Sequence, residues 1–212
     1  AQQNYGVSLN TDINSFQSCP NDIVRYKVNI VNIGEFSNSF ELDVAEHGLS
    51  ERITLSENTV DLDKGESRIV YLYVNSPIDS GDYFFSLNAR SLYGDQEQNL
   101  DFILRVNPCY SYKLDVTNNA FSLCERTYLE VPINLENQGS VINSYEAFLE
   151  GPVWARLENT ALVLNSGEEK LFRLGLAPDY GASGNYTATL TLVPERGNLN
   201  AYTDFNIAVR PC

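Results

Sequence analysis

The sequence contains the same pattern twice, about 105 residues apart. SCPNDIVRYKVNIVNIGEFSNSF at 18–40 aligns without a gap with LCERTYLEVPINLENQGSVINSY at 123–145. Both segments place a cysteine before an alternating apolar run and end that run with Asn-x-Gly. The match continues to a final Pro-Cys in each copy. Because a repeat defines the units of a fold, we expect two tandem domains, 1–109 and 110–212.

Within each copy, apolar residues alternate with polar ones. Tyr26, Val28 and Ile30 would face one way, and turn sequences such as Ser80-Gly81-Asp82 separate the runs. This period is that of a half-buried strand, and short strands at this spacing are typical of a β-sandwich. We therefore predict an all-β chain of two tandem immunoglobulin-like β-sandwiches with about seven strands each. In the first copy the expected strands are 5–12, 23–33, 37–46, 50–56, 67–75, 82–91 and 97–107.

Tyr83 and Tyr186 occupy matching places, each after Gly-Asp or Gly-Asn at the start of the sixth expected strand. A sandwich places its tyrosine corner there, with a hydroxyl that ties down the preceding turn. We interpret both tyrosines as structural.

Four cysteines allow three pairings. Each copy has one cysteine before its second expected strand and one at its end. The pairing that treats both copies alike joins Cys19 to Cys109 and Cys124 to Cys212. Seven strands in up-and-down order would also place the two cysteines of each copy at the same end of its sandwich. A zinc site would need tight spacing such as Cys-x-x-Cys, which the sequence lacks. Two such bridges indicate an oxidising location outside the cytosol.

The net charge is −14, from 28 acidic residues against 14 Lys and Arg, and both copies are acidic. Nucleic acid is not an expected partner, because binding it takes a basic stripe. No apolar run reaches the roughly 18–20 residues that span a bilayer, so we expect no membrane insertion by this chain. The sequence lacks Met, and Ala1-Gln2-Gln3 suits a start left by a signal peptidase. We predict a secreted, extracellular or cell-surface protein.

The sequence offers little for catalysis. His47 is its one histidine, and no phosphate loop, Gly-x-Ser-x-Gly or His-Glu-x-x-His occurs. Asp61, Asp63 and Glu66 could offer oxygens to calcium, but the ordered spacing of a calcium loop is missing. We expect no enzyme, no cofactor and no metal site.

A few residues are candidates for an interaction surface. Tyr71 and Tyr73 alternate with core positions, so both rings should point outward, where they would suit a protein neighbour or a sugar ring unless a loop or the adjoining domain covers them. Trp154 is either a rim residue packed under its loop or a glycan platform. Asn185 begins the sequon Asn-Tyr-Thr and is a candidate glycosylation site.

A resemblance accompanies these patterns. Asn137-x-Gly139, Trp154, Gly167-Glu168 and Gly184-x-Tyr186 resemble immunoglobulin-like modules of bacterial and archaeal surface proteins, notably the CARDB (cell-adhesion-related) type and the sandwich domain attached to alpha-galactosidases. The first copy has the same elements without the Trp, and the cysteine pair departs from those families. The resemblance implies an accessory or adhesion module without catalytic residues.

We therefore predict a non-catalytic structural or adhesion protein of a prokaryotic cell surface, with an archaeal source favoured. It would act as a spacer or assembly subunit through sandwich faces and strand edges. Its partners would be other copies of itself or neighbouring surface domains. The alternative is a carbohydrate-binding accessory module with glycans as partners. A two-domain pilus chaperone also has two sandwiches, but its basic cleft is missing here.

Overall fold

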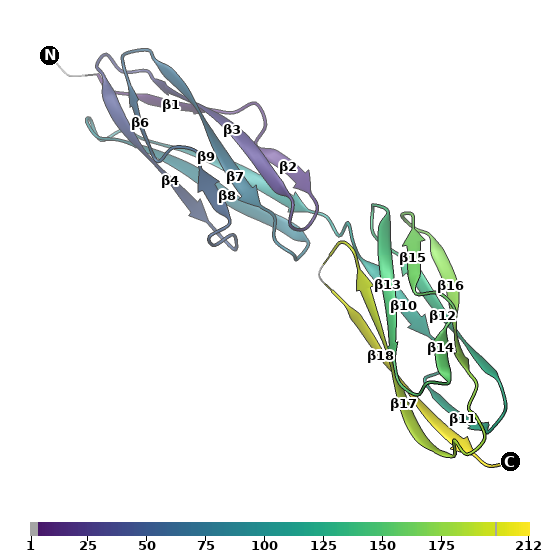
Figure 1. Ribbon diagram of the computed structural model, residues 1–212. Helices are drawn as coiled ribbons and strands as arrows, with labels where there is room; N and C mark the ends of the chain where they lie inside the picture. Colours follow the sequence, from purple (N-terminus) through teal and green to yellow (C-terminus); the bar gives the residue numbers. More distant parts are fainter. Residues whose placement is uncertain (1–3, 198) are drawn as a thin grey trace. The chain divides into compact units, whose positions relative to one another are not determined.

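The computed structural model describes residues 4–197 and 199–212. The chain divides into two compact units, Ala1–Pro108 and Cys109–Cys212, whereas the sequence analysis placed Cys109 in the first domain. All the regular elements of the described residues are strands (Figure 1). None of those residues belongs to a helix long and apolar enough to cross a membrane.

The first unit is a sandwich of two sheets. The four-stranded sheet has the order β1 (Val7–Asn10), β3 (Ile23–Asn32), β7 (Ser67–Asn75), β5 (Ile53–Leu55). The five-stranded sheet has the order β2 (Ser15–Ser18), β9 (Glu97–Val106), β8 (Gly81–Ser91), β4 (Asn38–Glu46), β6 (Thr59–Leu62). Every pairing in this unit is antiparallel except that of β2 with β9, which is parallel.

The second unit repeats this topology strand for strand. Its four-stranded sheet has the order β10 (Tyr112–Val116), β12 (Leu129–Asn137), β16 (Glu169–Leu176), β14 (Ala155–Leu157). Its five-stranded sheet has the order β11 (Ala120–Cys124), β18 (Ala201–Arg210), β17 (Gly184–Pro194), β13 (Asn143–Glu150), β15 (Ala161–Leu164). Each unit is thus an immunoglobulin-like β-sandwich, which is the predicted fold class.

The described residues of each unit form nine strands, where about seven were expected. The two extra strands of the first unit are β2 and β6, both four residues long. After β1 the chain turns at residues 11–14 and crosses from the edge of the four-stranded sheet to the edge of the five-stranded sheet. It forms β2 there, so β1 and β2 together follow the region where one strand, 5–12, was expected. β6 buries only Val60 and Leu62, too short an alternation to stand out.

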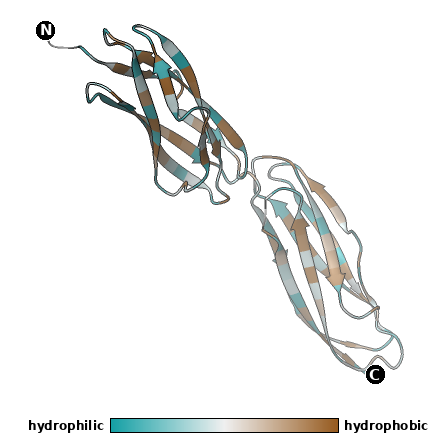
Figure 2. Cartoon of the chain, turned by 60° about the vertical axis from the view of Figure 1, so that its left-hand side comes forward, coloured by the Kyte–Doolittle hydropathy of each residue, from teal (hydrophilic) through white to brown (hydrophobic). Residues whose placement is uncertain are grey.

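The core lies between the two sheets of each unit, and hydropathy alternates along the strands (Figure 2). Tyr26 is completely buried at the centre of the first core, with its ring edge-on to Phe16, Phe85 and Phe102. Its hydroxyl donates to the carbonyl of Ile103, 2.7 Å away in the opposite sheet. A buried tyrosine needs such a partner, and here the bond also joins the two sheets.

The parallel pairing of β11 with β18 brings the ends of these strands together. Cys124 is the last residue of β11 and is in register with Arg210, near the end of β18. Cys124 and Cys212 form a disulfide with Cα atoms 5.5 Å apart. Cys19 and Cys109 are disulfide-bonded as well. The shared pole arises from the parallel strand pair, and not from seven strands in up-and-down order as the sequence analysis argued.

Candidate functional site

Asn32 and Asn137, the asparagines of the two Asn-x-Gly motifs, are buried hubs of the loops at one end of each unit. The Asn32 amide donates to the carbonyls of Phe36 and Leu62, at 2.8 and 3.1 Å, and its Oδ1 accepts from the backbone N–H of Gly34. Asn137 makes the same three bonds in the second unit. These amides are therefore committed to structure.

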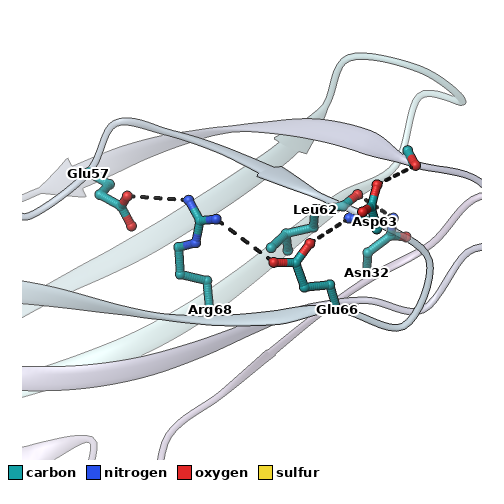
Figure 3. A network of polar contacts seen from close by, with 7 residues as sticks. Asn32, Glu57, Leu62, Asp63, Glu66 and Arg68 are labelled. Atoms are coloured by element: carbon teal, nitrogen blue, oxygen red, sulfur yellow. Dashed lines mark hydrogen bonds and ion pairs between the residues drawn. The ribbon is translucent and has the colours of Figure 1, made fainter.

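The acidic residues next to this hub are also engaged. Glu66 accepts from the backbone N–H of Asp63 and pairs with Arg68, which reaches Glu57 on its other side (Figure 3). Asp63 accepts from the Ser37 hydroxyl at 2.7 Å. Within the described ranges, no group of three His, Cys, Asp or Glu side chains is arranged to hold a metal ion.

Both tyrosine corners are formed. Tyr83 donates to the carbonyl of Asp79 at 2.8 Å, and Tyr186 to that of Ala182 at 2.9 Å. Trp154 lies beside the second corner, with its ring edge-on to Tyr186 at 5.1 Å between centroids. It is half-buried and packs against the second core. This packing favours the interpretation of Trp154 as a rim residue.

Tyr71 and Tyr73 lie on the outward face of β7. Tyr71 is half-buried, Tyr73 is 38% exposed, and their ring centroids are 6.3 Å apart. The guanidinium of Arg25 lies over the Tyr71 ring, 4.7 Å from its centroid. Lys27 is in register with Tyr71, and Arg25 with Tyr73. The two tyrosines therefore share their surface with two cations, which the sequence analysis did not anticipate.

The face around these tyrosines has no acidic residue on its strands. We call it the β3–β7 face. Pairing register and burial place the following residues on it: Ser8, Asn10, Ile23, Arg25, Lys27, Asn29, Val31, Thr54, Ser67, Ile69, Tyr71, Tyr73 and Asn75. Among the described residues, no carboxylate lies within ion-pair distance of Arg25 or Lys27.

A hollow of about 460 Å³ opens beside the β3–β7 face, where the connection between β1 and β2 passes the sheet. Its polar lining includes Asn10, Thr11, Lys27 and Asn29, and Asp12 contributes its one carboxylate. This volume lies within the range of about 300–1,000 Å³ that is usual for small-molecule sites.

The equivalent face of the second unit has a different electrostatic character. Arg173, which replaces Tyr71 there, pairs with Glu130 at 3.5 Å and with Glu158 at 3.3 Å. Lys113 pairs with Asp115 at 2.7 Å. Arg173 and Lys113 are thus paired with neighbouring carboxylates, whereas Arg156, which is exposed on β14 in register with Gly175, is in none of the ion pairs among the described residues.

Two further features lie on the five-stranded sheet of the second unit. Asn185 and Thr187, the ends of the sequon, are both exposed on β17. On the same face Phe148, Thr191 and Tyr202 form one row across three strands, with Phe148 51% and Tyr202 68% exposed. The sequence analysis missed this apolar row, because it exists only in the register of the three strands.

No protein-family model matches the sequence, and no curated protein matches it. Among solved structures, the chain is similar to the ASH/PapD-like domain 7 of human CEP192, with 14% identity and a TM-score of 0.37 over 47% of this chain and 84% of that one. It is also similar to the CsuC-CsuE chaperone-tip adhesion subunit complex of Acinetobacter baumannii, with 11% identity and a TM-score of 0.39 over 96% and 99% of the two chains.

A third similar structure is Escherichia coli alpha-2-macroglobulin, at 10% identity and a TM-score of 0.39. The match covers 97% of this chain but spans only 17% of that protein. The assignment of each unit as an immunoglobulin-like β-sandwich rests on the sheet order of this chain.

Proposed function

We propose that this chain is a non-catalytic structural module of the CARDB-like type from a prokaryotic, archaeal cell surface. It acts there as a spacer or assembly subunit. The main support is the engagement of its polar groups. Asn32 and Asn137 are bonded to their own loops. The carboxylates beside these hubs, those of Asp63, Glu66 and Glu168, are bonded there too. The disulfide-bonded cysteines favour an extracellular location.

We further propose that copies of the chain associate through sheet faces rather than strand edges. Every edge strand has only three to five residues, from β5 and β14 at three to β10 and β11 at five. Short edges limit strand addition from another molecule. The apolar row of Phe148 and Tyr202 is the face that we expect a second copy to cover, because burying aromatic side chains stabilises an interface.

The test is light scattering after size-exclusion chromatography of the oxidised protein over a range of concentrations. A discrete oligomer or a filament that dissociates in Phe148→Glu is the expected result. Phe84→Glu is the matched control, since Phe84 is 55% exposed on the first unit. A strictly monomeric protein at all concentrations would refute self-assembly and leave the spacer role. Assembly lost equally in both variants would refute the choice of face.

A further inference from the structure

We propose that the β3–β7 face of the first unit binds an acidic glycan, that is, a polysaccharide with carboxylate or sulfate groups. This goes beyond the structural role, because it assigns a ligand class to one face of one unit. Three properties of that face lead to the inference: its charge, its aromatic rings and its adjoining hollow.

The local charge favours an anion. The chain as a whole has a net charge of −14, yet the strands of this face place two cations and no carboxylate outward. Arg25 and Lys27 have no ion-pair partner among the described residues, so their charges are available to a ligand. Attraction between opposite charges falls off over about 8–10 Å in physiological salt, so a ligand on this face is governed by these cations more than by distant acidic residues.

The aromatic rings favour a sugar over a simple anion. Tyr73 is exposed, and the guanidinium of Arg25 lies over the half-buried ring of Tyr71. An aromatic ring with a polar tip offers an apolar surface to the C–H face of a sugar and a hydroxyl to its oxygens. A cation next to such a ring suits a sugar that has a carboxylate or sulfate on it.

The hollow supplies groups that match sugar hydroxyls. Asn10 and Asn29 are in register with each other across β1 and β3, and both line it together with Lys27. An amide can donate and accept at once, as a hydroxyl does. The carboxylate of Asp12 on the lining would repel an anionic ligand, so its removal should tighten binding.

The second unit provides an internal contrast. Its equivalent face has Arg173 held between Glu130 and Glu158, and Gly175 in the place of Tyr73. The pair of tyrosines is absent there, and the one cation without an ion pair among the described residues of that face, Arg156, shares the face with the carboxylates of Asp115, Glu130 and Glu136. We therefore expect the acidic glycan to bind the first unit only.

The experiment uses the full oxidised chain and polygalacturonate, with chondroitin sulfate as a sulfated probe and a neutral glucan of similar length as reference. Calorimetric titration in low salt should detect binding of at least one acidic polymer and none of the neutral glucan. The double variant Arg25→Ala/Lys27→Ala should weaken binding at least tenfold, Tyr73→Ala should weaken it severalfold, and Asp12→Asn should strengthen it. Arg90→Ala is the control, because Arg90 is an exposed cation on β8 of the other sheet.

Failure of both acidic polymers to bind would overturn the proposal. So would equal weakening by Arg90→Ala, or equally tight binding of single-stranded poly(dT), since either would indicate attraction of any polyanion. Loss of self-association in the double variant, with no glycan binding in the parent protein, would identify the face as an interface between copies instead. Asp12→Asn keeps the test decisive if the double variant fails to fold, because stronger binding is not a consequence of unfolding.

Discussion

A β-carbon added at Gly139 would lie 2.0 Å from the carbonyl oxygen of Cys109. The matching Gly34 meets the backbone of Tyr5 and Gly6 at 2.9–3.0 Å in the same way. The glycine of Asn-x-Gly is therefore required because another backbone segment passes directly over it. By contrast, Gly167 needs its left-handed conformation, with φ of 74°, and has nothing within 4 Å of an added Cβ.

Replacing Gly139 by Ala should therefore destabilise the second unit by about 2–3 kcal/mol, since backbone atoms cannot yield as a side chain can. Gly167→Ala should cost about 1 kcal/mol, the usual cost of a left-handed residue with a Cβ. Urea unfolding followed by Trp154 fluorescence measures both, because Trp154 is the one tryptophan of the sequence and lies in that unit. Equal costs for the two variants would contradict the close approach.

Asn137→Ala should cost about 2–3 kcal/mol in the same assay. Asn137 is fully buried, and its removal leaves the carbonyls of Val141 and Leu164 and the N–H of Gly139 without their partner. Asn206→Ala is the control, because Asn206 is exposed on β18. A loss no larger than that of the control would show that the hub is dispensable.

Arg126→Asn should stabilise the second unit by up to about 1 kcal/mol. Arg126 has φ of 61°, a left-handed conformation that is costly for most side chains and milder for Asn. The first unit has Asn21 at the matching place, with φ of 63°. The reverse change, Asn21→Arg, should destabilise the first unit, which calorimetry of the whole protein can follow. A neutral result in both directions would mean that the turn relaxes without cost.

Acid should weaken the turn that Glu125 holds. The Glu125 carboxylate accepts from the hydroxyl and the backbone N–H of Ser183, at 2.5 and 2.9 Å. The hydrogen bond from the Ser183 hydroxyl, and after it the one from the Gly181 backbone, lower the pKa of Glu125 below its usual value of 4.5. A carboxyl whose folded pKa is lowered stabilises the protein above its unfolded pKa, and that contribution is lost as the pH falls through the folded pKa.

The stability advantage of the parent protein over Glu125→Gln should therefore be largest near neutral pH and shrink below about pH 4.5. Unfolding at a series of pH values, followed by Trp154 fluorescence, measures this difference. Glu150→Gln serves as the control for the loss of one exposed carboxylate from the same unit. A difference that grows on acidification would reverse the assigned sign.

Peptide mapping under non-reducing conditions should recover two crosslinked peptides, one with Cys19 and Cys109 and one with Cys124 and Cys212. Removing the second bridge with Cys124→Ser/Cys212→Ser should cost about 4–5 kcal/mol on the chain-entropy model, because the bridge spans 88 residues. A crosslink between Cys19 and either Cys124 or Cys212 would refute the pairing of Cys19 with Cys109 that we propose.

The sequence predicts much of this fold because alternation is a local signal. Tyr26, Val28 and Ile30 are all completely buried, as their spacing indicates. The short strand β2 escapes the same logic, since Phe16 is its only large apolar residue and its partner β9 lies far along the chain. A parallel pairing at an edge leaves almost no trace in the local pattern.

The candidate site is harder to predict for a related reason. Tyr71 and Tyr73 can be assigned to an outward face from alternation alone. That Arg25 and Lys27 stand beside them depends on the register between β3 and β7, and net charge gives no hint of an acid-free face. Surface chemistry is a property of neighbours across strands, whereas composition averages over the whole chain.

The bridge between Cys124 and Cys212 also determines what happens when the second unit is stretched. Tension applied before Cys124 and at Cys212 would pass through the two sulfur atoms. The 88-residue span that the bridge closes would therefore not carry this force. Only β10, β11 and the short segments next to them could be drawn out. The oxidised unit would resist extension under force even if its sheets unfolded. Reduction of the bridge would allow the whole unit to be extended.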